Sequence, residues 1–165
     1  MSNWAMALNI DYNDTKGNFT GYTWYKDGVA QNGNPTGGSS CQVGDTINWC
    51  VAAANLPSDV TLSRLVFAVG KFQGHNDGTE GSPFNMGNTA AGSAQCWNEQ
   101  TSATAWSAPV SGYQGFANAL PVQQDPGAVG KRSKYEFTLV AIYTDGSGNS
   151  RQFGCDPEID VDNGT

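Results

Sequence analysis

Apolar residues recur at every second position in several parts of the chain, which is the spacing of a β-strand with one buried face. The first such stretch runs from Trp4 to Tyr12 and alternates bulky apolar side chains with small or polar ones. The same period predicts strands within Phe19–Tyr25, Thr46–Ala54 and Val60–Phe72. Asp27-Gly28, shortly after the second stretch, is a strong hairpin signal.

The longest alternating stretch, Ser133–Asp162, predicts a long strand, a tight turn and a returning strand. One face of its first strand is apolar between Tyr135 and Tyr143, and the opposite face also becomes apolar toward the end. Two apolar faces are typical of a central strand that is covered on both sides. The Gly and Asn residues of Asp145–Asn149 tolerate the positive φ angles that such a turn requires.

No part of the chain has the periodicity of an amphipathic helix. From Gln73 to Gly130 the alternation fades, and isolated aromatic residues remain as anchors for short strands or for a functional loop. A succession of short strands without helices predicts an all-β fold, an antiparallel β-sandwich of immunoglobulin-like or jelly-roll type. At 165 residues, we expect a single domain, residues 1–165, with the first and last strands inside the sheets.

The composition disfavours several classes of partner. A net charge of −7 and a sequence pI near 4.4 argue against binding to nucleic acids and to anionic membranes. No apolar run is long enough for a membrane-spanning helix, and the N-terminal residues do not resemble a signal peptide. We therefore expect no membrane insertion and a cytoplasmic location, with release or deposition in inclusions as alternatives.

Four cysteines, Cys41, Cys50, Cys96 and Cys155, lie far apart and lack the C-x-x-C spacing of zinc and redox sites. Buried thiols are one interpretation, and one or two disulfides are the other. Four cysteines allow three pairings, and the sequence does not choose among them.

Candidate catalytic chemistry is sparse. His75 is the single histidine, and the chain has no nucleophile elbow, zinc-protease motif, P-loop or dinucleotide-binding fingerprint. Acid–base and nucleophilic catalysis need a poised group of this kind, so we expect a protein that is not an enzyme. A carboxylate-based hydrolase is an alternative, because acidic residues alternate along Asp156–Asp162.

Two groups of acidic residues are candidate metal ligands. Asp77 and Glu80 lie with Asn76 in a glycine-rich loop, and hard oxygen ligands on a flexible loop are what Ca²⁺ requires. Asp160 and Asp162 belong to the alternating carboxylates, which point to one side of the last expected strand. The alternatives are an ordinary hydrophilic loop and an edge strand whose charges prevent pairing with other sheets. No other cofactor is expected.

Aromatic residues beside amide-rich loops favour carbohydrate binding, since ring faces stack on sugars while amides bond the hydroxyl groups. The candidate ligand-binding residues are Trp97, Asn98 and Trp106, together with His75 and Asn76 of the glycine-rich loop. Packing of the two tryptophans in the core is the alternative interpretation. A glycan is therefore the candidate partner.

Two further parts of the sequence carry a family resemblance. Val43–Trp49 reads V-G-D-T-I-N-W, and the C-terminal stretch contains Tyr135-x-Phe137, Tyr143-Thr144-Asp145 and Asp156-Pro157-x-Ile159-x-Val161. Together they resemble the PixA/AidA-type inclusion-body proteins of bacteria. The resemblance implies a small intracellular β-sandwich that a bacterium makes in quantity and sometimes deposits in inclusions. It implies no catalytic residues.

The sequence thus leads to one main hypothesis and two alternatives. The main hypothesis is a non-enzymatic bacterial β-sandwich that acts by self-assembly, as a homo-oligomer or in inclusions, or by ligand binding. The first alternative is a carbohydrate-binding lectin, with or without a requirement for Ca²⁺. The second is the carboxylate-based hydrolase.

Overall fold

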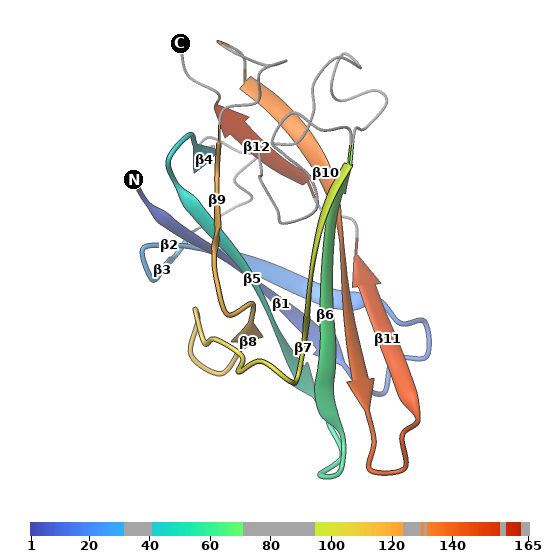
Figure 1. Cartoon of the computed structure of the whole chain (residues 1–165). Helices are drawn as coiled ribbons and strands as arrows, with labels where there is room; N and C mark the ends of the chain where they lie inside the picture. The colour runs from blue at the N-terminus through green and yellow to red at the C-terminus, as the bar shows by residue number, and fades with distance from the viewer. Residues whose placement is uncertain (32–40, 71–94, 124–129, 131, 156–157, 163–165) are drawn as a thin grey trace.

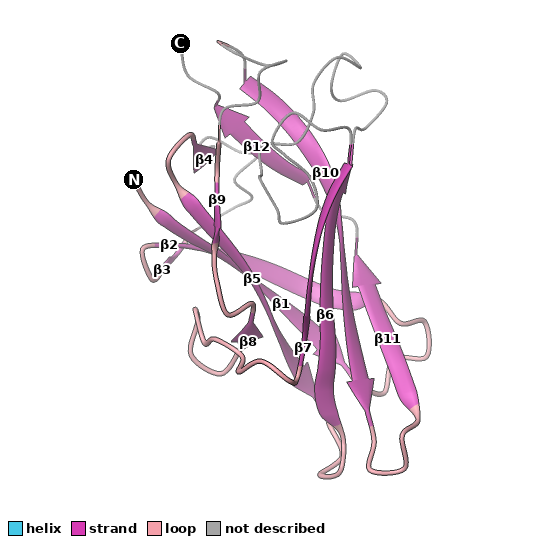
Figure 2. Cartoon of the chain, viewed as in Figure 1, coloured by secondary structure: helices cyan, strands magenta, loops and turns pink. Residues whose placement is uncertain are grey.

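The described part of the chain is built from strands alone. The computed structural model describes residues 1–31, 41–70, 95–123, 130, 132–155 and 158–162. For some strand residues it describes only the backbone, namely 69–70, 95–97, 132–136 and 158–160. These residues form twelve strands and no helix (Figures 1 and 2). The all-β sandwich expected from the alternation is confirmed.

The strands form two sheets of six. Sheet A contains β1 (Asn3–Asp11), β2 (Phe19–Lys26), β3 (Val29–Ala30), β5 (Thr46–Ala54), β8 (Gln114–Gly115) and β9 (Leu120–Pro121). Its order is β3-β2-β1-β5, and both β8 and β9 pair with β5. Sheet B contains β4 (Cys41–Gln42), β6 (Thr61–Gly70), β7 (Gln95–Thr101), β10 (Arg132–Thr144), β11 (Ser150–Cys155) and β12 (Glu158–Asp162). Its order is β4-β12-β10-β6-β7, and β11 also pairs with β10.

Most neighbouring strands are antiparallel, while β1 with β5 and β12 with β4 are parallel. The first and last strands lie inside the sheets, as expected from their alternation, and β10 is central in sheet B. The interpretation of the last strand as an edge is wrong at its C-terminal end. There β4 pairs with Val161 and Asp162, so the backbone groups at this end of β12 are used within the sheet.

The core lies between the two sheets and is rich in aromatic rings. Trp49 of β5 stacks on Phe67 of β6 with 3.9 Å between ring centroids, and it meets the edge of Phe137 on β10 at 5.5 Å. The alternating residues of β1, β5, β6 and β10 are buried here, as predicted: Trp4, Met6, Leu8, Ile10, Ile47, Trp49, Val51, Leu65, Phe67, Phe137, Leu139, Ala141 and Tyr143. Burial of these side chains is the main force that holds the sheets together.

The chain passes from sheet B to sheet A at a corner between β4 and β5, where a buried carboxylate holds the N-terminus. Asp45, 5% exposed, accepts hydrogen bonds from the backbone nitrogens of Ser2 and Gln42, at 2.7 and 3.0 Å, and from Nε1 of Trp4 at 2.9 Å. Burial acts to raise the pKa of Asp45, but the three bonds and the N-terminal amine together hold it below its ordinary value. The ionised carboxylate therefore fixes the start of β1.

A second set of contacts joins the segment after β1 to sheet B. The Arg151 guanidinium on β11 donates to the backbone carbonyls of Tyr12 and Asp14, and it lies 4.8 Å from the centre of the Tyr12 ring. The backbone nitrogen of Gly154 donates to the carbonyl of Gly17 at 2.9 Å. The two sheets are thus connected by polar contacts at this edge as well as by the core.

Candidate functional site

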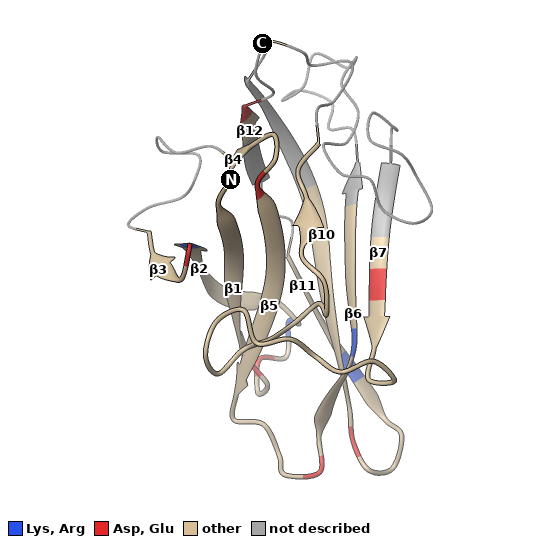
Figure 3. Cartoon of the chain, turned by 60° about the vertical axis from the view of Figure 1, so that its left-hand side comes forward, with Lys and Arg blue, Asp and Glu red and all other residues tan. Residues whose placement is uncertain are grey.

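Residues 102–119, between β7 and β9, run along the β5 edge of sheet A (Figures 1 and 3). Trp106 and Phe116 pack on the core side, while other residues of the segment reach the outer face, the face turned away from the core. Within this segment, β8 pairs with β5. The Tyr113 hydroxyl donates to Oδ1 of Asn9 on β1 at 2.8 Å, and Nδ2 of Asn48 on β5 donates to the carbonyl of Phe116 at 2.9 Å. We call residues 102–119 the strap. Ala5 and Ala7, which alternate with the core residues of β1, are buried on this outer side.

One side chain of sheet B holds both ends of the strap. Gln100 on β7 is 8% exposed, and its Oε1 accepts a hydrogen bond from the backbone nitrogen of Ala117 at 2.6 Å. Its Nε2 donates to the carbonyls of Thr104 and Ala105 at 3.3 and 3.1 Å. A single carboxamide therefore satisfies three backbone groups from the two ends of the strap.

Replacing Gln100 with alanine removes the partner of these three groups, so we expect the free energy of unfolding to fall by about 2 kcal/mol. The exposed Gln114, on the same strap, provides the control: its alanine variant should differ from wild type by less than about 0.5 kcal/mol. Urea denaturation measures both. Equal stability of the two variants would show that Gln100 does not hold the strap.

Close contact between the strap and β5 depends on Gly115. A Cβ atom at this position would lie 2.9 Å from Cβ of Cys50 and 3.0 Å from the carbonyl oxygen of Trp49, closer than side chains normally approach. Ser107 and Gly115 also exchange two backbone hydrogen bonds, at 2.9 and 3.0 Å. The strap is thus folded back on itself and fixed on β5.

A hollow of about 400 Å³ lies between the strap and the N-terminal half of β1. This volume is within the range of small-molecule sites. We call it the groove. The residues that determine its chemistry come from β1, from β2 and the turn after it, from β5 and from the strap: Asn3, Ala5, Tyr25, Asp27, Asn48 and Pro109.

The groove combines an aromatic ring with oriented polar groups. Half-buried Tyr25 lies opposite the small Ala5 in the β1–β2 register. Asp27 accepts a hydrogen bond from the backbone nitrogen of Asn3 at 2.8 Å. Oδ1 of Asn3 accepts one from the Thr46 hydroxyl, also at 2.8 Å, which fixes the amide with its Nδ2 group as a donor. Such a site can bind a polar ring through one face and several hydroxyl groups.

The electrostatics of the groove are those of a nearly neutral site. Burial, with a contribution from the neighbouring Tyr25 phenol, raises the pKa of Tyr113, so this hydroxyl stays protonated and continues to donate to Asn9. Among the described residues that line the groove, Asp27 carries the only formal charge. None of these described lining residues can therefore neutralise an anionic ligand.

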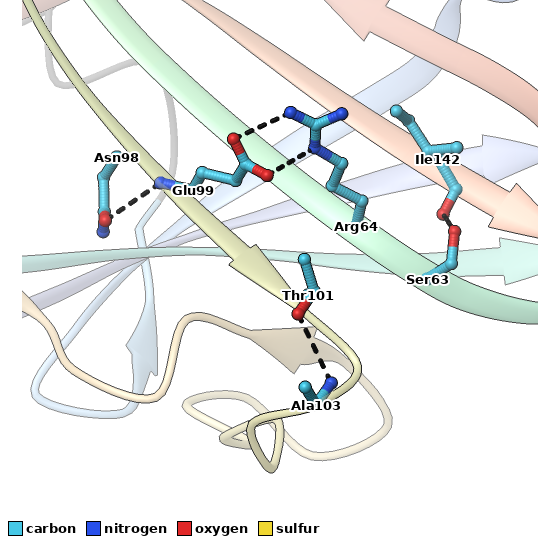
Figure 4. Close-up of polar contacts among 7 residues, drawn as sticks. All are labelled: Ser63, Arg64, Asn98, Glu99, Thr101, Ala103 and Ile142. Atoms are coloured by element: carbon cyan, nitrogen blue, oxygen red, sulfur yellow. Dashed lines mark hydrogen bonds and ion pairs between the residues drawn. The ribbon is translucent and has the colours of Figure 1, made fainter.

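The aromatic and amide candidates from the sequence lie elsewhere. Trp106 of the strap is half-buried and packs against the core, in line with the core-packing alternative, and it does not line the groove. Asn98 lies opposite Phe67, and its Oδ1 accepts a hydrogen bond from the backbone nitrogen of Glu99 at 2.9 Å (Figure 4). Trp97 is paired with Ala68 in the same register, and its side chain lies outside the described residues.

The candidate metal ligands fall mainly outside the described residues. This is true of Asp77 and Glu80, of their neighbours His75 and Asn76, and of the Asp160 side chain. Asp162 is half-buried at the end of β12. Within the ranges that the structure describes, no three His, Cys, Asp or Glu side chains are grouped to hold a metal ion. Calcium binding stays a prediction.

Cys50 is a buried thiol on β5 beneath the strap. Its Sγ donates to the carbonyl of Met6 at 3.6 Å, and burial raises its pKa to about 12. A thiol that resists ionisation is a poor nucleophile. Cys50 is buried and forms no disulfide, so the buried-thiol interpretation of the cysteines holds for this one.

The groove residues were not identified from the sequence, although one signal was available. Tyr25 is an aromatic residue two positions before the Asp27-Gly28 turn, and it lies on the face of its strand opposite to that of buried Trp24. An aromatic ring on an outward face indicates either a covering segment or a ligand. The strap is the covering segment here, and it lies far from Tyr25 in sequence. The alternation is too weak in that part of the chain to predict which strand the strap contacts.

Comparison of the chain with protein-family models, with curated proteins and with solved structures finds no match. No helix of the described part is long and apolar enough to cross a membrane. The resemblance to inclusion-body proteins stays a prediction.

Proposed function

We propose that the protein is a non-catalytic carbohydrate-binding protein and that the groove binds a neutral sugar. The observation that carries the proposal is the position of the half-buried Tyr25 ring beside the small Ala5, within a hollow of about 400 Å³ that also contains amide groups. An aromatic ring face attracts the C–H groups of a sugar, while amides and a carboxylate orient its hydroxyl groups.

The charge of the groove supports a neutral ligand over an acidic one. Asp27 contributes a negative charge, no Lys or Arg is among the described lining residues, and the whole chain carries a net charge of −7. A sialylated or sulfated glycan would meet repulsion from this field. A neutral sugar meets no such repulsion, and its hydroxyl groups can donate hydrogen bonds to Asp27.

Binding without hydrolysis is supported by the number of carboxylates. A glycosidase normally uses two carboxyl groups on either side of the scissile bond. Asp27 is the single carboxylate among the described residues that line the groove, and it already accepts a hydrogen bond from Asn3. The groove therefore fits recognition better than hydrolysis.

Replacing Tyr25 with alanine is expected to weaken sugar binding about tenfold or more, because the stacking surface is lost. Tyr25→Phe keeps the ring and should retain most of the affinity. Tyr22→Ala is the matched control, since Tyr22 lies on the same strand, is 45% exposed, and alternates to the opposite face. A glycan array compares the three variants with wild type. Unchanged neutral-glycan signals for Tyr25→Ala would remove the groove as the site.

A further inference from the structure

A second hollow, of about 480 Å³, lies on the outer face of sheet B, where β10 turns into β11. Ile142 of β10 contributes to it and alternates with the core residues Ala141 and Tyr143, which places the hollow on the side away from the core. Ser63 and Arg64 of β6, together with Ser150 and Gln152 of β11, supply its polar groups. We call it the hydroxyl hollow.

Three hydroxyl groups cross the sheet here in a chain whose direction can be worked out. Ser63 donates its one proton to the carbonyl of Ile142 at 3.0 Å (Figure 4). In the 2.8 Å contact between Ser63 and Thr144, Thr144 must therefore be the donor. Its proton is then used, so Ser150 donates in the 2.8 Å contact between Thr144 and Ser150. Each of the three hydroxyl oxygens keeps at least one free lone pair, so these groups can accept hydrogen bonds from a ligand.

The donors of the hydroxyl hollow come from Arg64. Its Nε and Nη2 bind the two carboxylate oxygens of Glu99, both at 2.7 Å, which holds the guanidinium in a fixed plane (Figure 4). A guanidinium has five N–H groups, so the remaining ones stay available to a ligand. Gln152 adds an amide with both a donor and an acceptor.

Two arginines belong to the lining of the hydroxyl hollow, and each already has partners. Glu99 neutralises Arg64, and the other arginine of the lining, Arg151, is directed to the carbonyls of Tyr12 and Asp14. A neutral ligand with adjacent hydroxyl groups can donate to Ser63 and Ser150 and accept from Arg64 without breaking any existing contact.

We propose that the hydroxyl hollow is a second site for neutral sugars, so that one chain binds two sugars on opposite faces of the sandwich. This inference rests on the proposed function for its ligand class, while its evidence is independent of the groove. Two sites that face away from each other allow one chain to join two glycan chains, with the gain in avidity that multivalent binding gives.

Amide NMR of the full chain tests the inference, with the methyl glycosides of glucose, galactose, mannose and N-acetylglucosamine as probes. At least one of them should shift two separate groups of resonances, at Ala5 and Tyr25 and at Arg64, Ser150 and Gln152. The double variant Ser150→Ala/Gln152→Ala should weaken binding at the hydroxyl hollow about tenfold and leave the groove unchanged. Tyr25→Ala should weaken binding at the groove and leave the hydroxyl hollow unchanged. Ser147 is exposed and lies outside both sites, so Ser147→Ala is the control and should bind as wild type does.

The outcomes separate the two proposals. Shifts at the groove alone would overturn the second site and leave the proposed function standing. Shifts at the hydroxyl hollow alone would support the second site and remove the groove. No shift with any of the four probes would overturn both.

Discussion

Replacing Trp49 with alanine is expected to lower the free energy of unfolding by about 4 kcal/mol, within the usual range for a buried tryptophan. Trp49 is fully buried on β5 and contacts Phe67 and Phe137 of sheet B. The substitution therefore removes packing between the sheets and leaves a cavity that neighbouring rings cannot fill. Guanidinium denaturation, followed by circular dichroism, measures the loss.

Leu56→Ala is the control for this experiment, because Leu56 is an apolar residue 36% exposed in the loop after β5. Its variant should lose well under about 1 kcal/mol. A similarly small loss for Trp49→Ala would mean that the sheets do not pack through this ring, and the arrangement of the core would have to be revised.

Asp45→Asn is expected to lower the free energy of unfolding by about 3 kcal/mol at neutral pH. The carboxylate accepts three hydrogen bonds through its two oxygens, from Ser2, Trp4 and Gln42. An asparagine has one oxygen, so its NH₂ group must face at least one of these donors. Asp59→Asn, an exposed carboxylate near a turn, should have little effect.

The same pair of proteins tests the electrostatics. The pKa of Asp45 is lower in the folded protein than its unfolded value of about 3.9, so its ionisation stabilises the fold above that pH. The difference in stability between wild type and Asp45→Asn should be constant above about pH 5. It should shrink as the pH falls below about 4 and the folded carboxylate takes up its proton. A difference that does not change with pH would contradict this role.

Much of the fold follows from the sequence because one local rule governs it. Alternation at Trp4–Ile10, at Ile47–Val51 and along β10 identifies the faces that are buried, and the turn at Asp145–Asn149 connects β10 and β11. The choice of neighbouring strands does not follow from the same rule, because the parallel pairing of β1 with β5 joins strands that are separated in sequence by β2, β3 and β4. Alternation gives the face of a strand but not its neighbour.

The candidate site was less accessible to sequence reasoning. Gln100 and Asn48 look like ordinary polar residues, and their roles depend on backbone groups such as those of Ala117 and Phe116, which no local pattern connects to them. Trp106 is a candidate sugar-binding ring in the sequence, but it packs against the core, in line with the alternative interpretation. Self-association and deposition in inclusions stay predictions that light scattering over a concentration series can test.

The crystal structure of the protein with the neutral oligosaccharide that gives the strongest array signal tests the central claim most directly. The account expects a sugar ring against the face of Tyr25, with hydroxyl groups within hydrogen-bonding distance of Asn3 or Asp27. An oligosaccharide bound elsewhere, with Tyr25 free of contact, would contradict it.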